Sequence, residues 1–140
     1  MKVEWWIFLT VFGLYVAAFS GLASANAPAQ IAEPGVVEIE THDENGDARR
    51  TKIWIVSQGD KVYVRTTDSI WHANLVREQR ATLYADAGSE AASALLVSDA
   101  ALQTSVNELF AEKYGFANTL RNWMVAFGSA NMWVLTLDTL

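Results

Sequence analysis

Three hydroxyl side chains lie close together where a strand pattern ends and a helix pattern begins: Thr66, Thr67 and Ser69. Hydroxyls at a helix start, together with the free N–H groups of the first turn, form a corner that can receive an anion. Two arginines, Arg49 and Arg65, can add charge-assisted hydrogen bonds to such an anion. The alternative is a plain helix cap, with arginines that pair with acidic side chains at the surface.

Two tryptophans and an asparagine close in sequence to this corner suit a flat ring system. Trp54 and Trp71 offer broad aromatic faces, and Asn74 can both donate and accept hydrogen bonds at a ring edge. Asn has no propensity advantage inside a helix, so its position favours a specific role. The alternative for the tryptophans is that both are core or interface aromatics.

Several other kinds of chemistry are excluded. The chain has no cysteine, which rules out thiolate nucleophiles, disulfides and cysteine-ligated metals. The two histidines, His42 and His72, lack a third ligand at a recognisable spacing, so no metal site is predicted. No serine-nucleophile motif, P-loop or dinucleotide fingerprint is present. We therefore predict no catalytic side chain and no metal ligand.

Charge argues against a nucleic-acid partner. The net charge is −6, and the sequence contains no dedicated nucleic-acid motif. Residues 49–80 are locally basic, with seven Lys and Arg residues against three acidic ones. Either a solvated strand face or an anion-binding surface explains this stretch.

The elements that position these residues are mostly strands. Apolar periodicity and turn signals predict strands over residues 36–41, 50–57, 61–66, 81–85, 94–97 and 132–137, and helices over 70–78, between Asp99 and Gly115, and between Asn118 and Gly128. This order predicts an α+β fold that is mainly β, a small antiparallel β-barrel with two or three helices packed outside it.

The N-terminus has the composition of a targeting segment. Residues 5–22 are uncharged and apolar, and Ala23-Ser24-Ala25 offers a signal-peptidase site. The run is also long enough for a membrane-spanning helix. We therefore divide the chain into a signal peptide or membrane anchor (1–27), a linker (28–35) and one domain (36–140). The domain is expected to be exported (periplasmic or extracellular) or anchored to the membrane by this segment.

Three ordered stretches resemble the split-barrel superfamily that includes pyridoxamine-phosphate-oxidase-like proteins and deazaflavin-dependent nitroreductases. Gly46-x-x-Arg49-x-Thr51 is similar to its second strand, residues 62–67 to its third strand, and Trp71-x-x-Asn74-Leu75 to its first helix. The nearest branch is small and uncharacterised. Two departures stand out: Lys52 replaces the usual Pro, and Glu78-Gln79-Arg80 replaces Asn-Pro-Arg.

The resemblance implies a homodimer with FMN or a deazaflavin across the barrel, and its phosphate where the third strand meets the first helix. The implied cofactor-binding residues are Arg49, Thr51, Trp54, Arg65, Thr66, Thr67, Ser69, Trp71 and Asn74. The implied activity is reduction of small electron-poor or quinone-like molecules. A non-catalytic barrel that binds a small-molecule ligand or a protein partner is the alternative, and haem with His72 as axial ligand is a more remote one.

Overall fold

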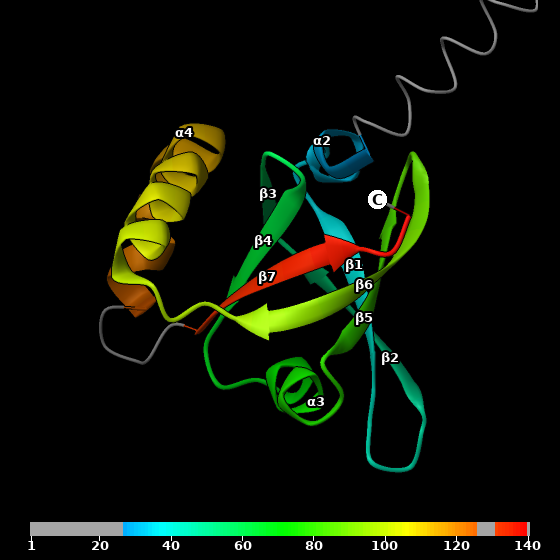
Figure 1. Ribbon diagram of the computed structural model, residues 1–140. Helices are drawn as coiled ribbons and strands as arrows, with labels where there is room; N and C mark the ends of the chain where they lie inside the picture. Colours follow the sequence, from blue (N-terminus) through cyan, green and yellow to red (C-terminus); the bar gives the residue numbers. More distant parts are fainter. Residues whose placement is uncertain (1–26, 126–130, 140) are drawn as a thin grey trace, which may run out of the picture.

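The computed structural model describes residues 27–125 and 131–139, with the side chains of 116–125 left out. Figure 1 shows the elements in chain order: α2 (Ala27–Ala32), β1 (Val37–His42), β2 (Ala48–Ile53), β3 (Ile55–Gln58), β4 (Lys61–Thr66), α3 (Ile70–Glu78), β5 (Arg80–Ala85), β6 (Gly88–Leu96), α4 (Ala100–Val125) and β7 (Asn131–Leu137). None of the helices in this part of the chain is long and apolar enough to span a membrane.

The strands form one antiparallel sheet in the order β2-β1-β5-β6-β7-β4-β3. The first and last strands in this order are the two halves of a single segment that is interrupted only at Trp54. The sheet therefore curls round until its two ends meet in the chain. This confirms the predicted α+β fold and the split β-barrel.

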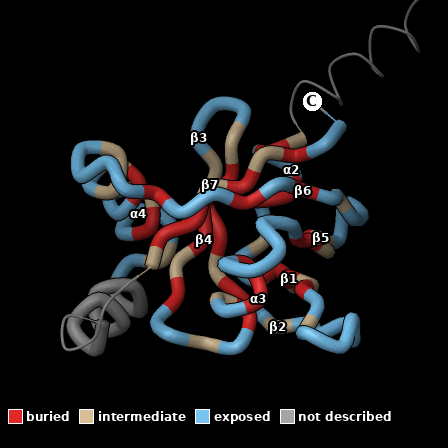
Figure 2. Tube along the Cα trace, turned by 60° about the horizontal axis from the view of Figure 1, so that its bottom comes forward, coloured by how far each residue is buried: buried red, intermediate tan, exposed pale blue. Residues whose placement is uncertain are grey.

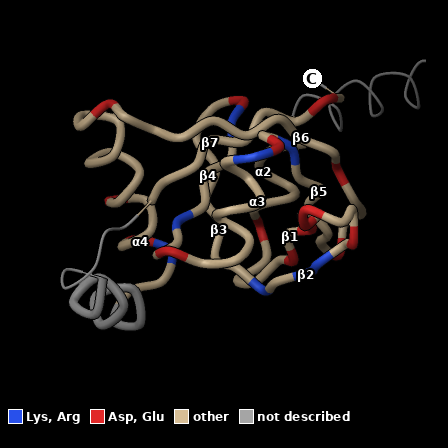
Figure 3. Tube along the Cα trace, turned by 90° about the horizontal axis from the view of Figure 1, so that it is seen from below, with Lys and Arg blue, Asp and Glu red and all other residues tan. Residues whose placement is uncertain are grey.

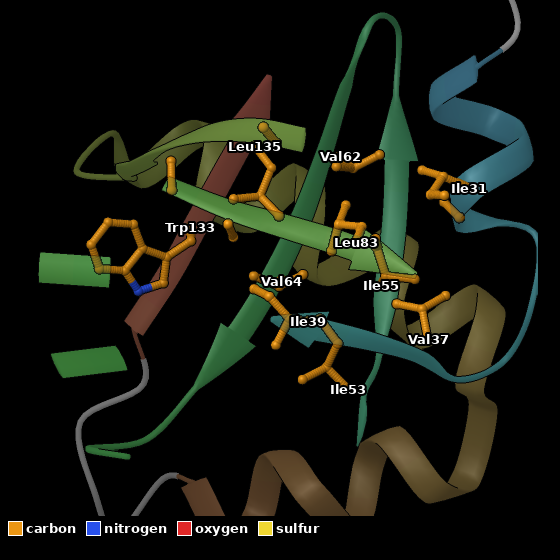
Figure 4. Packing of buried hydrophobic residues seen from close by; sticks show 14 of the residues in the cluster. Ile31, Val37, Ile39, Ile53, Ile55, Val62, Val64, Leu83, Trp133 and Leu135 are labelled. Carbon is orange, nitrogen blue, oxygen red and sulfur yellow. The ribbon is translucent and has the colours of Figure 1, made fainter. Parts of the chain in front are cut away.

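Alternating apolar residues fill the barrel interior. Val37 and Ile39 of β1 are 2% and 0% exposed, and Val62 and Val64 of β4 are both 0% exposed, because successive strand residues point to opposite faces. Figure 4 shows these side chains meeting those of the neighbouring strands inside the barrel. The period-2 pattern in the sequence is therefore confirmed in β1 and β4.

The stretch predicted as a linker is different. Residues 27–32 form α2, whose Ile31 and Ala32 belong to the barrel core. In Figure 1, α2 and α3 lie at opposite ends of the barrel. Alanine-rich sequence with a proline near the start is compatible with a short helix, since Pro is tolerated in a first turn. The globular unit therefore begins before residue 36.

α4 covers the outer face of β3, β4 and β7. Val106 and Phe110 of α4 pack there in a second apolar cluster, to which the sheet contributes Val56, Tyr63 and Met132. The helix contains one non-helical residue, Gly115, with φ 56° and ψ −129°. This glycine is where the sequence predicted a helix end, so two helices, one on each side of Gly115, make up the segment labelled α4.

Candidate cofactor site at the split of the barrel

The barrel parts where one strand changes partner. β3 pairs with β4 up to the pair Ile55–Val64. On the N-terminal side of Trp54 the same segment forms β2, which pairs only with β1. The end of β4, from Arg65, pairs only with β7. We call this unpaired region the split, with residues 48–54 on one side and 65–69 on the other. Seven of the nine predicted cofactor residues lie along it: Arg49, Thr51, Trp54, Arg65, Thr66, Thr67 and Ser69.

The hydroxyls of Thr66 and Ser69 lie together at the start of α3. Thr66 Oγ1 and Ser69 Oγ lie 3.0 Å apart, and the N–H of His72 donates to Ser69 Oγ over 3.2 Å. Ser69 is thus the helix cap. The Thr66–Ser69 bond uses one of the two hydroxyl protons, whichever side chain donates, so the other remains for an acceptor. The helix cap is therefore observed, and binding of an anion at this corner stays a prediction. Thr67 beside them is exposed.

Arg49 and Arg50 lie on opposite faces of β2 and differ in their partners. Arg49 lies opposite Thr41 in the β1–β2 register, is exposed, and makes no ion pair with any residue that the structure describes. Arg50 donates from Nε to Glu40 Oε2 over 3.0 Å, and this bond raises the pKa of Arg50. Thr51, two residues from Arg49 on the same face, is half-buried. Figure 2 shows β2 as mostly exposed, whereas β4 is largely buried.

The locally basic stretch does not form one positive surface. Figure 3 shows Lys and Arg residues spread over several elements. Most of them have an acidic neighbour: Arg50 pairs with Glu40, Lys61 with Asp60, Arg77 with Glu78 and Arg80 with Asp138. Within the described chain, Arg49 is thus one of the few basic residues of this stretch with no acidic partner.

Trp54 and Arg65 are held by α4. The rings of Trp54 and Tyr114 stack with centroids 4.3 Å apart and an interplanar angle of 6°. Arg65 donates from Nη1 to Asn107 Oδ1 over 2.7 Å, and its Cζ lies 3.9 Å from the Phe110 ring centroid. The structure therefore places these two predicted residues, one from each side of the split, in contact with α4.

Trp71 and Asn74 point into the protein. Trp71 is 6% exposed and belongs to the barrel core. Asn74 is 3% exposed, and its Nδ2 donates to Thr41 Oγ1 over 3.0 Å. The specific role expected for Asn74 is thus met by a buried hydrogen bond between α3 and β1. Contact of either residue with a cofactor stays a prediction.

Sequence reasoning missed Lys113 and Tyr114. Lys113 Nζ donates to the carbonyls of Ala32, Pro34 and Ile55, the last two over 2.9 and 2.7 Å, and burial lowers its pKa. Tyr114 Oη accepts from the Ile55 N–H over 2.9 Å, and burial raises its pKa. Together they fix α4 where the split begins. Nothing in the helical pattern distinguishes them from surface residues.

His72 makes a contact that bears on haem. The indole Nε1–H of Trp133 donates to His72 Nδ1 over 3.0 Å. In a neutral imidazole whose Nδ1 accepts, the proton is on Nε2, which leaves no lone pair for iron. This geometry disfavours His72 as an axial ligand. The described residues also contain no group of three or more side chains suited to a metal ion.

Comparison with known proteins identifies the fold. Residues 28–134 match the sequence model of a family described as "Uncharacterized protein conserved in bacteria (DUF2255)". No curated protein matches the sequence. Among solved structures, the haem storage protein HutZ from Vibrio cholerae is similar with a TM-score of 0.64 and 14% identity, over 79% of this chain and 87% of that one.

Two further structures are flavin- or pyridoxine-related by name. A protein of the pyridoxinephosphate oxidase family from Clostridium acetobutylicum has a TM-score of 0.59 and 13% identity, with 83% of this chain and 84% of that one covered. An FAD-binding protein from Mesorhizobium loti has a TM-score of 0.58 and 5% identity, with 77% and 82% covered. These likenesses confirm the split-barrel fold.

Proposed function

The chain belongs to the DUF2255 family, and from this premise and its split-barrel fold we propose that it binds a phosphate-bearing flavin or deazaflavin at the split. The observation that carries the proposal is the arrangement of the two sides of the split. One side carries the exposed Arg49, which has no ion-pair partner in the described chain. The other side carries Thr66 and Ser69, and one of their two hydroxyl protons is not used by the hydrogen bond between them.

The donor set suits a phosphate. Arg49 supplies a positive charge and a planar set of N–H donors, and Ser69 or Thr66 supplies a hydroxyl at a helix start. Thr51 and Thr67 add hydroxyls on either side of the split. When bound, a flavin or deazaflavin supplies hydride transfer, so the protein needs only to bind and orient it.

The wider proposal is a reductase of small electron-poor or quinone-like molecules, active as a homodimer. The similarity to an FAD-binding split barrel supports the cofactor class. The uncharged run of residues 5–22 supports export or anchoring to the membrane. A chain exported in the unfolded state would have to bind its cofactor after translocation.

The test is a titration of the full-length chain with FMN, a deazaflavin cofactor and haemin, followed by absorbance and mass spectrometry. We expect FMN or the deazaflavin to bind, and Arg49→Ala to weaken that binding by about tenfold or more, the size of a charge-assisted hydrogen bond. Arg50→Ala is the matched control, because its side chain lies on the opposite face of the same strand and already pairs with Glu40.

Each other outcome has a defined meaning. Flavin binding that is unaffected by Arg49→Ala would place the cofactor elsewhere. Binding of haemin alone would favour the haem function suggested by the similarity to HutZ. Binding of none of the three would refute the proposal and leave a non-catalytic barrel that binds another ligand or a protein partner.

A further inference from the structure

A hollow lies on the outer face of β1, β2 and β5, and we call it the outer groove. Its volume is about 490 Å³, within the range of small-molecule sites. Its main lining residues are Val36, Glu38, Arg50, Lys52, Tyr84 and Asp86. They alternate along their strands with buried core residues such as Val37, Ile53 and Leu83. The groove therefore lies on the opposite face of β2 from Arg49 and Thr51.

One wall of the groove is fixed in place. Arg50 is held by its Nε bond to Glu40, 3.0 Å long, and by the Tyr84 ring, whose centroid lies 3.7 Å from Cζ. The bond to Glu40 uses Nε and leaves both Nη groups without a carboxylate partner among the described residues. A guanidinium held in this way loses little conformational entropy when it binds a carboxylate.

The other charged residues of the groove form no ion pair with any residue that the structure describes. Lys52 lies directly opposite Glu38 in the β1–β2 register, yet the two make no ion pair. Asp86 at the other side also has no hydrogen bond or ion pair within the described part of the chain. Opposite charges at facing strand positions usually interact. The groove thus presents a cationic side on β2 and two free carboxylates across from it.

An apolar surface lies among these charges. Val36 is 51% exposed, whereas the next residue, Val37, is buried in the barrel core. Tyr84 offers a half-buried aromatic ring beside it. Isolated exposed apolar residues are common, but here one sits within a hollow that is bordered by unpaired charges of both signs.

From this arrangement we propose that the outer groove binds a small zwitterion with an apolar side chain, the chemistry of a free α-amino acid. A simple anion would meet Glu38 and Asp86, and a simple cation would meet Arg50 and Lys52. A zwitterion can place its carboxylate toward Arg50 and Lys52 and its ammonium toward Glu38 and Asp86. Its side chain then covers Val36. The proposal does not depend on a cofactor at the split.

The test uses the full-length chain and three probes with the same benzyl side chain: L-phenylalanine, N-acetyl-L-phenylalanine, which lacks the ammonium charge, and L-phenylalaninamide, which lacks the carboxylate charge. We expect the free amino acid to bind, and each derivative to bind about tenfold more weakly or worse, since each loses one charge-assisted contact. Amide chemical shifts of residues 36–38 and 84–86 should move on binding. Lys52→Gln should weaken L-phenylalanine binding, whereas Arg49→Gln, on the opposite face of β2, should not.

Three results would overturn the proposal. The first is equal binding of the acetylated or amidated probe, which would show that one charge is not recognised. The second is unchanged L-phenylalanine binding by both Lys52→Gln and Glu38→Gln. The third is a wild-type chain whose amides at residues 36–38 and 84–86 do not respond to L-phenylalanine at all. FMN titration of the same variants is independent, so failure here leaves the split untouched.

Discussion

The buried contact between Asn74 and Thr41 ties the first helix of the barrel to its first strand. Asn74 Nδ2 donates to Thr41 Oγ1 over 3.0 Å, and the two residues are 3% and 0% exposed. Water cannot replace either partner at such burial. Arg77 Nη2, at 3.4 Å from Asn74 Oδ1, is a weaker neighbour on an exposed side chain. Arg77 also donates to the carbonyl of His42, so Asn74–Thr41 is the buried one of two side-chain hydrogen bonds that join α3 to β1 in the described chain. The stability of the α3–β1 contact should therefore depend strongly on the buried bond.

Two nearly shape-preserving substitutions separate the bond from the packing. Thr41→Val removes the acceptor and leaves the Asn74 amide unpaired, and Asn74→Leu removes the donor and leaves the Thr41 hydroxyl unpaired. Each should cost about 1–3 kcal/mol of unfolding free energy, the penalty for a buried unpaired polar group. The double variant lacks both polar groups, so neither is left buried without a hydrogen-bond partner. It should be less destabilised than the sum of the single variants by about 1–2 kcal/mol.

The assay is urea unfolding of the four full-length chains, followed by circular dichroism, with the free energies compared as a double-mutant cycle. FMN titration of the folded Asn74→Leu variant supplies a second readout, and we expect its affinity to be unchanged. Additivity within about 0.3 kcal/mol would refute the structural role of the bond. A lost FMN affinity with an unperturbed cycle would instead assign Asn74 to the cofactor.

Three more predictions test the surroundings of the barrel. Ile31→Ala should lower the unfolding free energy by about 2–4 kcal/mol in urea, because α2 is part of the core. Lys113→Met should cost about 1–3 kcal/mol by the same measurement, since three carbonyls lose their donor. Burial lowers the pKa of Lys113, so wild type should gain stability relative to this variant as pH rises from that lowered pKa to the ordinary lysine value. The Arg80 guanidinium lowers the pKa of Asp138. The stabilisation by this pair should therefore be fully present above the ordinary aspartate pKa and disappear as pH falls through the lowered pKa. The variant Asp138→Asn should abolish this pH dependence of the unfolding free energy.

Local signals in the sequence located most of the barrel. Asn45-Gly46 and Gln58-Gly59 predicted hairpins, and the two glycines adopt φ values of 84° and 61°, which favour residues without a side chain. The sequence predicted a helix cap at Asp68 or Ser69, and the cap is Ser69. Each of these features depends on residues within a few positions of one another. A single sequence therefore contains the information that specifies them.

Contacts between distant elements could not be predicted in the same way. Thr41 and Asn74 are 33 residues apart, and the carbonyls bound by Lys113 lie 58 to 81 residues from it. Asn74 and Trp71 could be recognised as unusual, but only the fold shows that they face the core and not a ligand. The expected linker was wrong for a related reason: an alanine-rich helix has no periodic pattern to mark it, and α2 is stabilised by the barrel end that it covers.

The split itself is invisible in the sequence because the strand that forms it does not change its side-chain pattern. Ile53 and Ile55 are both buried in the barrel, and Trp54 between them points outward to Tyr114, so the alternation continues across the interruption. Only the pairing partner changes, from β1 to β4. At that point Ile55 needs new hydrogen-bond partners, and α4 provides them through Tyr114 and Lys113. α4 thus satisfies the backbone where the split begins.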